Sequence, residues 1–422
     1  MAIINASNTS GLVQTGDASG VLALQTGGTT AVTIDASGNV GIGTSSPTQK
    51  LDVTGNINTS GSLNSINTFG FKNRIINGGM AIDQRNAGAQ ITAANLAPSA
   101  YMVDRWSYSA SQAAKFTAQQ NAGAVTTPVG FPNYLGMTVA SAFTVGAGDW
   151  FCIGQSVEGF NFADLAWGTA SAKTVTLSFV VYSSLTGTFG GALRNNATNR
   201  SYPFTYSIPT ANTWTTISVT IAGDTSGTWV GATNGLGVSL FFGLGVGTTY
   251  SGTAGAWAAT NYISVTGAVS VVGTSGATFY ITGVQLEKGS TATSFDYRPY
   301  GTELALCQRY FEKSFNVSVA PANGTTATTL IDNAGCFASM VINGTIDGGF
   351  ISFKVSKRAV PTLTIYGNNS GYWNYYSGGA SLWGANAYSP GTLGENGHAF
   401  SQQVVNAIAI AVRGHWTASA EL

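Results

Sequence analysis

The segment around residues 34–57 constrains the possible folds of this chain most, because its apolar residues come in short alternating pairs. Gly, Asn, Ser and Pro separate the pairs, which are Val32 with Ile34, Val40 with Ile42, and Leu51 with Val53. This pattern predicts short strands joined by turns. Each strand is too short to bury its apolar face alone. The segment therefore predicts several copies of the chain packed around a common axis.

The composition predicts an all-β protein. Among 422 residues there are 55 Gly, and aromatic residues make up 11% against 8% charged residues. This balance is typical of a turn-rich β protein rather than a helical or α/β enzyme, and a hydrophobic fraction of 44% argues against disorder. A net charge of zero offers no basic surface to a phosphate backbone or an anionic membrane, so we expect no nucleic-acid partner.

The cysteines argue against a disulfide-rich or zinc-binding protein, and the apolar stretches argue against a membrane-spanning one. Cys152, Cys307 and Cys336 are widely spaced and odd in number, which predicts neither a disulfide framework nor a zinc site and favours assembly in a reducing cytoplasm. The N-terminal residues lack the basic start and apolar core of a secretory signal. The charge-free stretch 225–286 is interrupted every few residues by Gly, Ser, Thr or Asn, so it predicts sandwich strands and no membrane insertion.

The chain is predicted to have three parts. Residues 1–70 form an N-terminal anchor and a short intertwined β shaft, residues 71–300 a jelly-roll-like β-sandwich, and residues 301–422 a short helix and a smaller C-terminal β-sandwich domain. For the larger sandwich, another antiparallel topology remains open. About eight strands are expected, and they include residues 134–139, 175–182, 214–221, 237–246, 262–272 and 278–286. Helical spacing of Leu304, Cys307 and Phe311 predicts the helix over residues 302–313.

Three runs of sequence carry a family resemblance. The run GNVGIGTSSPTQKLDVTGNI resembles the shaft segment of bacteriophage tail fibres and related virion fibres, which are commonly homotrimers. The runs FKNRIINGGMAIDQRN at 71–86 and TGVQLEKGSTATSFDYRPYGTELALCQRYFEKS at 282–314 resemble stretches that open and close carbohydrate-binding-like jelly-roll domains of phage fibre proteins. The resemblance implies a homotrimeric virion fibre, assembled in the host cytoplasm. It also implies that the N-terminal residues attach to another virion protein and that the fibre binds a host-surface polysaccharide or glycan.

An aromatic cluster between residues 366 and 388 is the candidate carbohydrate site. Sugars present flat C–H faces ringed by hydroxyls, so rings interleaved with amides on loops suit them. The cluster supplies Tyr372, Trp373, Tyr375, Tyr376 and Trp383 together with Asn374 and Asn386. The alternative is that these rings form a core or a trimer interface. Most of the remaining tryptophans are expected in the core, particularly Trp214, and Trp257 is expected to be exposed in a loop.

The chain offers little for catalysis, and we predict no enzyme, no catalytic residue, no metal site and no cofactor. His398 and His415 have no metal-ligand partner at a recognised spacing and are expected on the surface or in turns. A hydrolase would need paired carboxylates. The only local candidates are Asp149 with Glu158 and Asp164, and Asp332 with Asp347, which we expect to be turn caps and isolated ion pairs.

Two triplets combine a carboxylate, an aromatic ring and an arginine: Asp104, Arg105 and Trp106, and Asp296, Tyr297 and Arg298. We predict that ion pairs of these triplets close the larger sandwich where its first and last strands meet, with a calcium site as the alternative. Two other functions remain open for the whole chain. One is a virion component without a receptor, such as a capsid decoration or head fibre, a collar or a baseplate part. The other is a polysaccharide depolymerase.

Overall fold

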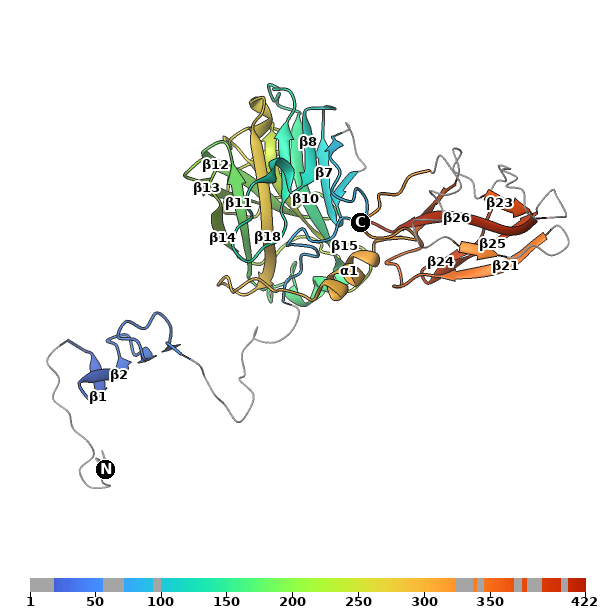
Figure 1. Ribbon diagram of the computed structural model, residues 1–422. Coiled ribbons are helices and arrows are strands. Elements are labelled where there is room, and N and C mark those ends of the chain that lie inside the picture. Colours follow the sequence, from blue (N-terminus) through green and yellow to red (C-terminus); the bar gives the residue numbers. More distant parts are fainter. Residues whose placement is uncertain are drawn as a thin grey trace. The chain divides into compact units, whose positions relative to one another are not determined.

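A computed structural model describes residues 19–55, 72–93, 100–323, 337–339, 345–367, 374–377, 389–403 and 409–422. Within these residues the chain is built almost entirely of β-strands, with one α-helix, which confirms the all-β prediction (Figure 1). It divides into two compact units, Met1–Thr68 and Phe69–Leu422.

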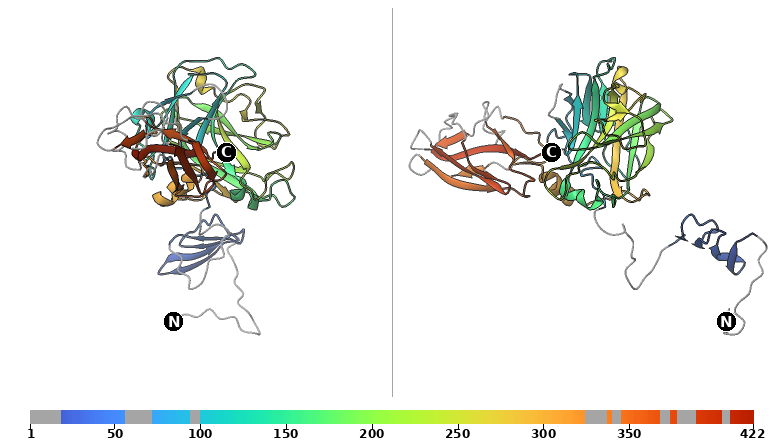
Figure 2. Two further views of the ribbon diagram at one scale, coloured as in Figure 1. Left: turned by 90° about the vertical axis from the view of Figure 1, so that its right-hand side faces the viewer. Right: turned by 180° about the vertical axis from the view of Figure 1, so that it is seen from behind.

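The first unit contains a four-stranded sheet in the order β1 (Leu22–Thr26), β2 (Thr29–Ile34), β3 (Val40–Ile42) and β4 (Leu51–Val53). All three predicted apolar pairs therefore lie in strands. Val32 lies opposite Ile42 in an antiparallel pair, and Val40 lies opposite Leu51 in a parallel one. Figure 2 shows the described part of the sheet, in blue, as a single layer of strands.

The turns of this unit explain its glycines and its aspartate. Gly38 and Gly43 have φ of 71° and 73°, a region that side chains with a Cβ rarely adopt. Between β2 and β3, Asp35 Oδ1 accepts hydrogen bonds from the backbone N–H groups of Ser37 and Asn39 at 2.9 and 2.8 Å. The bond from the Asn39 backbone lowers the pKa of Asp35 most, so the turn is held by an ionised carboxylate at neutral pH.

The second unit begins with a sandwich of two six-stranded sheets (Figure 1). The chain repeatedly crosses between the sheets, as a jelly roll does. One sheet, named the front sheet for the groove on its outer face, has the order β13 (Ser201–Ile208), β12 (Gly187–Asn195), β15 (Leu236–Val246), β10 (Trp150–Glu158), β7 (Trp106–Ala110) and β6 (Ala100–Val103). The back sheet has the order β14 (Thr215–Ile221), β11 (Val175–Ser183), β18 (Thr278–Lys288), β9 (Leu135–Val139), β8 (Phe116–Gln120) and β5 (Ile91–Thr92).

The predicted strands agree with the structure except at residues 262–272. There the chain forms only the short strand β17 (Ser264–Val265), which pairs in parallel with β16 (Ser251–Gly252), and later a 3₁₀ turn at Val271–Gly273. Val271 and Val272 are buried all the same. Their apolar pattern indicated burial correctly, but a single turn that packs on the core produces the same pattern as a strand.

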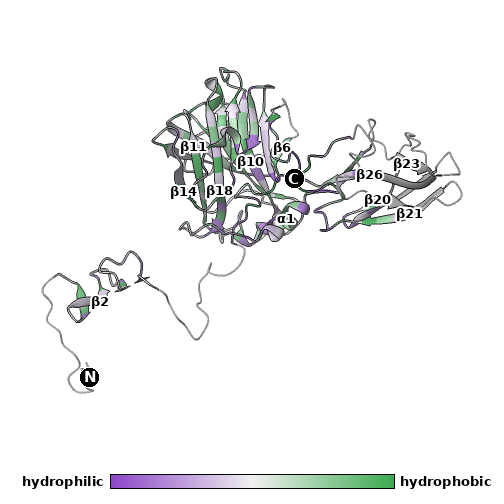
Figure 3. Ribbon diagram, in the orientation of Figure 1, coloured by the Kyte–Doolittle hydropathy of each residue, from purple (hydrophilic) through white to green (hydrophobic). Residues whose placement is uncertain are grey.

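The sandwich core is aromatic and lies between the two sheets. Phe242 of β15 packs against Phe179 of β11 with ring centroids 4.9 Å apart, and Trp106 of β7 lies 6.4 Å from Phe242. Phe179, Phe242 and Trp106 are all at most 1% exposed. Each of these residues alternates with neighbours on the outer face, as a strand with one buried face requires. Figure 3 shows the hydrophobic residues, in green, along β11 and β18.

The two runs that resemble the opening and closing stretches of a domain lie against each other. The amide of Asn73 bonds to β18 on both sides, donating to Val284 O at 3.0 Å and accepting from Leu286 N–H at 3.0 Å. Arg298 donates to the backbone carbonyl of Asn73 and pairs with Glu303 at 3.4 Å. The Asp296 carboxylate accepts from Asn73 N–H at 3.2 Å. The second triplet therefore ties the two ends of the sandwich together, as predicted.

The first triplet also contacts both runs, since the Trp106 indole donates to Asn77 O at 3.0 Å and the Arg105 guanidinium carbon lies 3.6 Å from the Tyr310 ring centroid. Its ion pair, however, is made with a residue outside the two runs, which corrects the prediction that ion pairs of both triplets close the sandwich. Arg105 forms an ion pair with Glu421 and donates to Ser156 O at 2.5 Å. Asp104 accepts from the backbone N–H of Gln84 at 3.0 Å, and burial raises the pKa of this carboxyl to about 7. Within this triplet it is Arg105 that joins Glu421 to the sandwich.

The residues after the sandwich begin with helix α1 (Tyr300–Gln308). The predicted helix is confirmed, but it ends earlier than expected, because Phe311 belongs to strand β19 (Phe311–Lys313). No helix among the described residues is long and apolar enough to span a membrane.

Two small sheets follow the helix. In the first, β26 (Ala409–Ser419) lies between β19 and β20 (Phe337–Ser339), and it also pairs with β22 (Thr362–Tyr366) and β23 (Asn374–Ser377). The second sheet has the order β21 (Thr345–Ser352), β25 (Gly397–Gln403) and β24 (Ser389–Gly394). The three-part division of the chain remains a prediction.

Candidate functional site

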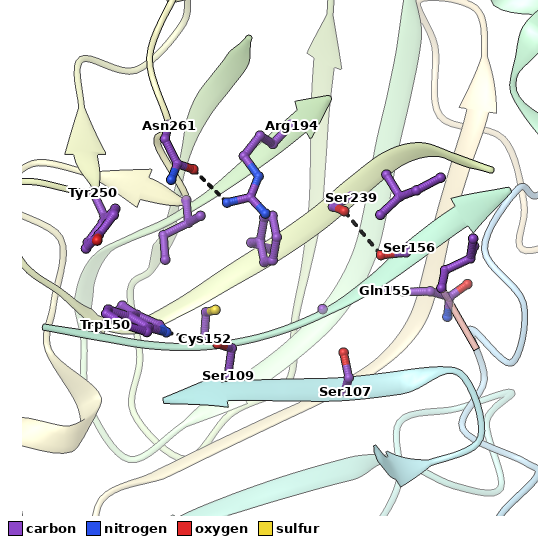
Figure 4. Close-up of a pocket in the computed structure, with 15 residues that line it drawn as sticks. Ser107, Ser109, Trp150, Cys152, Gln155, Ser156, Arg194, Ser239, Tyr250 and Asn261 are labelled. Atoms are coloured by element: carbon purple, nitrogen blue, oxygen red, sulfur yellow. Dashed lines mark hydrogen bonds between the residues drawn. The ribbon is translucent and has the colours of Figure 1, made fainter. Parts of the chain in front are cut away.

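A groove crosses the outer face of the front sheet, and its floor follows from strand alternation. In β15, Leu240 and Phe242 face the core, so Ser239 and Phe241 face outward. The groove has a volume of about 350 Å³ and is shown in Figure 4. It is lined by Ser107, Ser109, Trp150, Cys152, Gly154, Gln155, Ser156, Arg194, Leu236, Ser239, Phe241, Tyr250, Asn261, Ile263 and Leu422.

Two aromatic rings form one end of this Arg194 groove. Trp150, at the start of β10, and Tyr250, in the loop after β15, meet edge to face with ring centroids 5.3 Å apart and planes at 75°. Trp150 Nε1 donates to Ser109 Oγ at 2.9 Å, which fixes the orientation of the indole. Both rings are half-buried. They therefore offer fixed apolar surface while part of each ring stays open to a ligand.

A single cation lies beside these rings. Arg194 of β12 donates from Nη1 to Asn261 Oδ1 at 2.6 Å, and its guanidinium carbon lies 4.6 Å from the centroid of the Phe241 ring (Figure 4). Burial lowers the pKa of Arg194, but a guanidinium remains charged at any physiological pH. Burial raises the pKa of the neighbouring Cys152 thiol to about 12, so the thiol is neutral.

The chemistry of the groove suits a small polyhydroxylated ligand. Rings supply apolar contact, and the hydroxyls of Ser107 and Ser109, the amide of Asn261 and the guanidinium of Arg194 supply hydrogen bonds. A second hollow of about 530 Å³ lies on the back sheet beside Phe131, Phe295 and Tyr297. Its lining residues include no charged or amide side chain. The Arg194 groove is therefore the better candidate for a binding site.

The predicted carbohydrate cluster falls largely outside the described residues. Tyr372, Trp373, Trp383 and Asn386 lie there entirely. Asn374, Tyr375 and Tyr376 belong to β23, whose backbone pairs with β26, but their side chains are also outside the description. Whether these seven residues contact a sugar stays a prediction.

Both histidines are buried, contrary to the prediction of surface or turn positions. His398 and His415 are 0% exposed. His415 stacks on Phe315 with ring centroids 4.0 Å apart, and its Nδ1 lies 3.0 Å from Ser314 Oγ. His398 lies among aromatic rings, 5.7 Å from Trp416. Both follow polar or turn residues in sequence, and only the packing of the small sheets places them inside.

The described carboxylates that were considered for hydrolysis each have another partner. Glu158 is 1% exposed and accepts from Arg309 Nη2 at 2.6 Å and from the Tyr310 hydroxyl at 2.7 Å. Asp164 pairs with Arg74 at 2.7 Å, and Asp149 accepts from Ser111 Oγ at 2.8 Å.

Asp332 and the side chain of Asp347 lie outside the described residues. Among the residues described, no three His, Cys, Asp or Glu side chains gather as a metal site.

No protein-family model and no curated protein sequence matches this chain. Among solved structures, it is similar to the enzymatically active domain of bacteriophage CBA120 tailspike protein 4, with a TM-score of 0.27 and 11% identity over 51% of this chain and 21% of that one. The present chain thus spans about a fifth of the tailspike structure's length.

Two carbohydrate-binding modules are also similar. TmCBM61, in complex with β-1,4-galactotriose, has a TM-score of 0.26 and 10% identity over 52% of this chain and all of that one. The family 11 module of the Clostridium thermocellum cellulase Lic26A-Cel5E has a TM-score of 0.23 and 12% identity over 49% and 98%. At these scores the likeness assigns neither a family nor a ligand to this chain, and the groove is interpreted from its own residues.

Sequence reasoning missed the Arg194 groove because its residues are far apart in the chain. Trp150 lines the groove, and Trp214, expected in the core, is half-buried at the second hollow. Trp257, expected to be exposed, is half-buried against Trp167 with ring centroids 5.0 Å apart. One signal was available. Arg194 is the only charged residue between Lys173 and Arg200, and it lies in a strand of small and apolar residues, where an isolated cation has few structural reasons to be.

Proposed function

We propose that this protein is a virion fibre component, a phage tail fibre that binds a host-surface glycan without cleaving it. The Arg194 groove is the proposed glycan site. In this proposal three chains form the fibre and its N-terminal residues attach it to another virion protein. Weak contacts at each groove would be multiplied by the copies in a fibre and on a particle.

Glycan binding is supported by one observation: the rings of Trp150 and Tyr250 lie beside hydroxyl, amide and guanidinium hydrogen-bond donors. A sugar ring can lay its C–H face on one of these rings while its hydroxyls bond to Ser109 and Asn261. An apolar ligand would leave those polar groups unpaired, which costs free energy. A nucleic acid would find one cation in the groove rather than a basic track.

A binding assay with a Tyr250→Ala variant tests this site. The Tyr250 side chain lines the groove, whereas its backbone carbonyl accepts from Ile263 N–H at 2.9 Å, a bond that the substitution leaves intact. Loss of one ring contact should weaken binding to an array of host-surface polysaccharides by about two- to tenfold, since such contacts contribute roughly 0.5–1.5 kcal/mol.

The matched control is Phe160→Ala, which removes an aromatic ring that is 57% exposed and does not line the groove. Its binding should equal that of the wild type. Equal binding by Tyr250→Ala and wild type would contradict the proposed site. Shortened polysaccharide after incubation with the protein would instead favour the depolymerase alternative.

The aromatic cluster at residues 366–388 is proposed as a second glycan contact. The test compares adsorption to host cells for the wild type and for a Trp373→Ala, Trp383→Ala double variant that still forms oligomers. Reduced adsorption would support the cluster as a receptor contact, and unchanged adsorption would remove it. Labelling the protein on virions would separate a tail fibre from a capsid or baseplate component.

The proposed homotrimer is supported by the apolar surface of the first unit. Leu24, Ile42 and Leu51 of its sheet are 42%, 43% and 58% exposed. A single sheet of three- to six-residue strands cannot cover both of its own faces. Two further copies of the same sheet would bury these side chains and provide the axis that the alternating pattern predicts.

A further inference from the structure

We propose that the Arg194 groove selects acidic sugars, with the ligand carboxylate bound to the Arg194 guanidinium. This inference rests on the proposed glycan-binding function and specifies its ligand class. Three observations support it: the fold holds the Arg194 guanidinium in place, no described carboxylate pairs with it, and two aromatic rings lie beside it.

Arg194 is fixed in place before any ligand arrives. Its strand β12 pairs on both sides, so that Arg194 lies between Ser239 of β15 and Ser201 of β13. The guanidinium is held by the Asn261 amide at 2.6 Å and by the Phe241 ring at 4.6 Å. Holding a long side chain in one position normally costs conformational entropy when a ligand binds. Here the fold has already ordered the side chain.

The guanidinium lacks a counter-ion. No described carboxylate lies within 4.0 Å of it, and the lining residues of the groove include neither Asp nor Glu. A guanidinium carries five N–H donors, and the described residues accept one hydrogen bond from Arg194. Its Nε is buried without a hydrogen-bond partner among them.

Other arginines of the second unit show what the fold does with a structural guanidinium. Arg200 pairs with Asp224 through two hydrogen bonds of 2.7 and 2.6 Å, and Arg309 pairs with Glu158 in the same way at 2.9 and 2.6 Å. In each case a carboxylate with little exposure offsets the cost of desolvating the cation. Arg194 is just as constrained, but no described carboxylate offsets the desolvation cost of its guanidinium. A ligand carboxylate would offset that cost.

The surroundings favour a sugar acid over a small inorganic anion. Trp150 and Tyr250 provide apolar ring surface next to the cation, and a free anion would leave that surface unused. A pyranose ring with a carboxyl substituent can place its C–H face on a ring and its carboxylate on Arg194. Planar guanidinium and carboxylate groups match in geometry, and their charge-assisted hydrogen bonds are about twice as strong as neutral ones.

The test uses the full chain and two ligands with the same sugar backbone, trigalacturonate and its fully methyl-esterified form, in which methyl groups remove the charges of the carboxylates. Calorimetry at low salt should show the acid binding at least about tenfold more tightly than the ester. A trimer of N-acetylneuraminic acid is measured in parallel, because hexuronic and nonulosonic acids share the carboxylate but not the ring. Whichever acid binds more tightly identifies the source, and its affinity should fall as NaCl is added.

Variants assign the effect to one side chain. Arg194→Gln should bind acid and ester equally, with ester affinity within twofold of wild type. Arg194→Lys, which keeps the charge but loses the planar fork, should retain part of the difference. Lys173→Gln removes an exposed charge outside the groove and should behave like the wild type. Thermal unfolding checks each fold. Arg194→Gln should unfold within about 5 °C of the wild type, because it removes the hydrogen bond to Asn261 and the contact with the Phe241 ring but no described ion pair.

Three outcomes would overturn the inference. One is equal binding of acid and ester by the wild type, and another is an acid preference that survives in Arg194→Gln. In either case, neutral glycan binding that Tyr250→Ala weakens would show that the proposed function stands while the acidic specificity fails. The third is that neither these ligands nor a neutral glycan array binds, in which case both proposals fail.

Discussion

At the scale of single residues, burial rather than residue type decides what the ionisable groups do. His398 is the clearest case, since two histidines in a turn-rich chain suggested exposure and the structure shows full burial. The neighbouring rings Phe353 and Trp416 give the imidazole an apolar setting, with centroids 6.0 and 5.7 Å away. Burial lowers the pKa of His398 from 6.5 to about 4.

This shift predicts that acid destabilises the second unit through His398. The folded-state pKa lies below the unfolded one, so the unfolded chain binds the proton more readily. The contribution is complete above about pH 6.5 and is lost as the pH falls towards 4, up to about 3 kcal/mol in all. Urea unfolding at pH 7 and pH 5 should show the wild type losing more stability than His398→Phe. An identical loss in both proteins would contradict the assignment.

At the scale of elements, the strands show why glycine is frequent in this chain. Gly191 in β12 lies where a Cβ would come 2.3 Å from Phe241 O and 2.5 Å from the Phe204 ring. Gly301 in α1 has open space at the same point, with no heavy atom within 4 Å. Glycine is therefore required by close packing at the first position and is dispensable at the second.

The pair gives a matched prediction for alanine substitution. Gly191→Ala should lower the free energy of unfolding by about 1–3 kcal/mol, because backbone and ring must move apart. Gly301→Ala should be neutral or raise it by up to about 1 kcal/mol, because alanine favours helix and restricts the unfolded chain. Denaturant titration measures the free energy of unfolding of both variants. A loss of stability in Gly301→Ala similar to that in Gly191→Ala would show that local packing is not the cause.

At the scale of the whole molecule, the first unit differs from the second in how much apolar surface it buries. The second unit encloses a large aromatic core, whereas the described sheet of the first unit leaves leucine and isoleucine side chains exposed. Exposed apolar surface of this kind is unfavourable in water and is typical of a surface that another chain covers. The proposed cover is the same sheet from two other copies.

Light scattering should therefore give the mass of a trimer for the full chain. Leu24→Lys with Leu51→Lys places charges on the exposed apolar residues and should convert the trimer to smaller species. Val129→Lys is the control, because Val129 is fully exposed in the second unit and should not affect assembly. A wild-type monomer would exclude the trimer, and a trimer that tolerates the double variant would place its interface elsewhere.

The sequence by itself determined the all-β class, the short strands of residues 32–53, five of the twelve described strands in the two sandwich sheets and the existence of α1. These features follow from alternation, turn residues and helical spacing, which act over a few neighbouring residues. The ends of elements also depend on long-range pairing. Phe311 continues the helical spacing of Leu304 and Cys307, but pairing with β26 makes it a strand residue.

Only the tertiary structure decided where the groove lies and which groups face it. Trp150, Arg194 and Tyr250 come from β10, β12 and the loop after β15, and they meet because these strands are neighbours in the front sheet. Strand order and register are set by long-range pairing, and a one-residue change of register would turn Arg194 into the core. The same long-range packing left the Arg194 guanidinium without a carboxylate and buried His398.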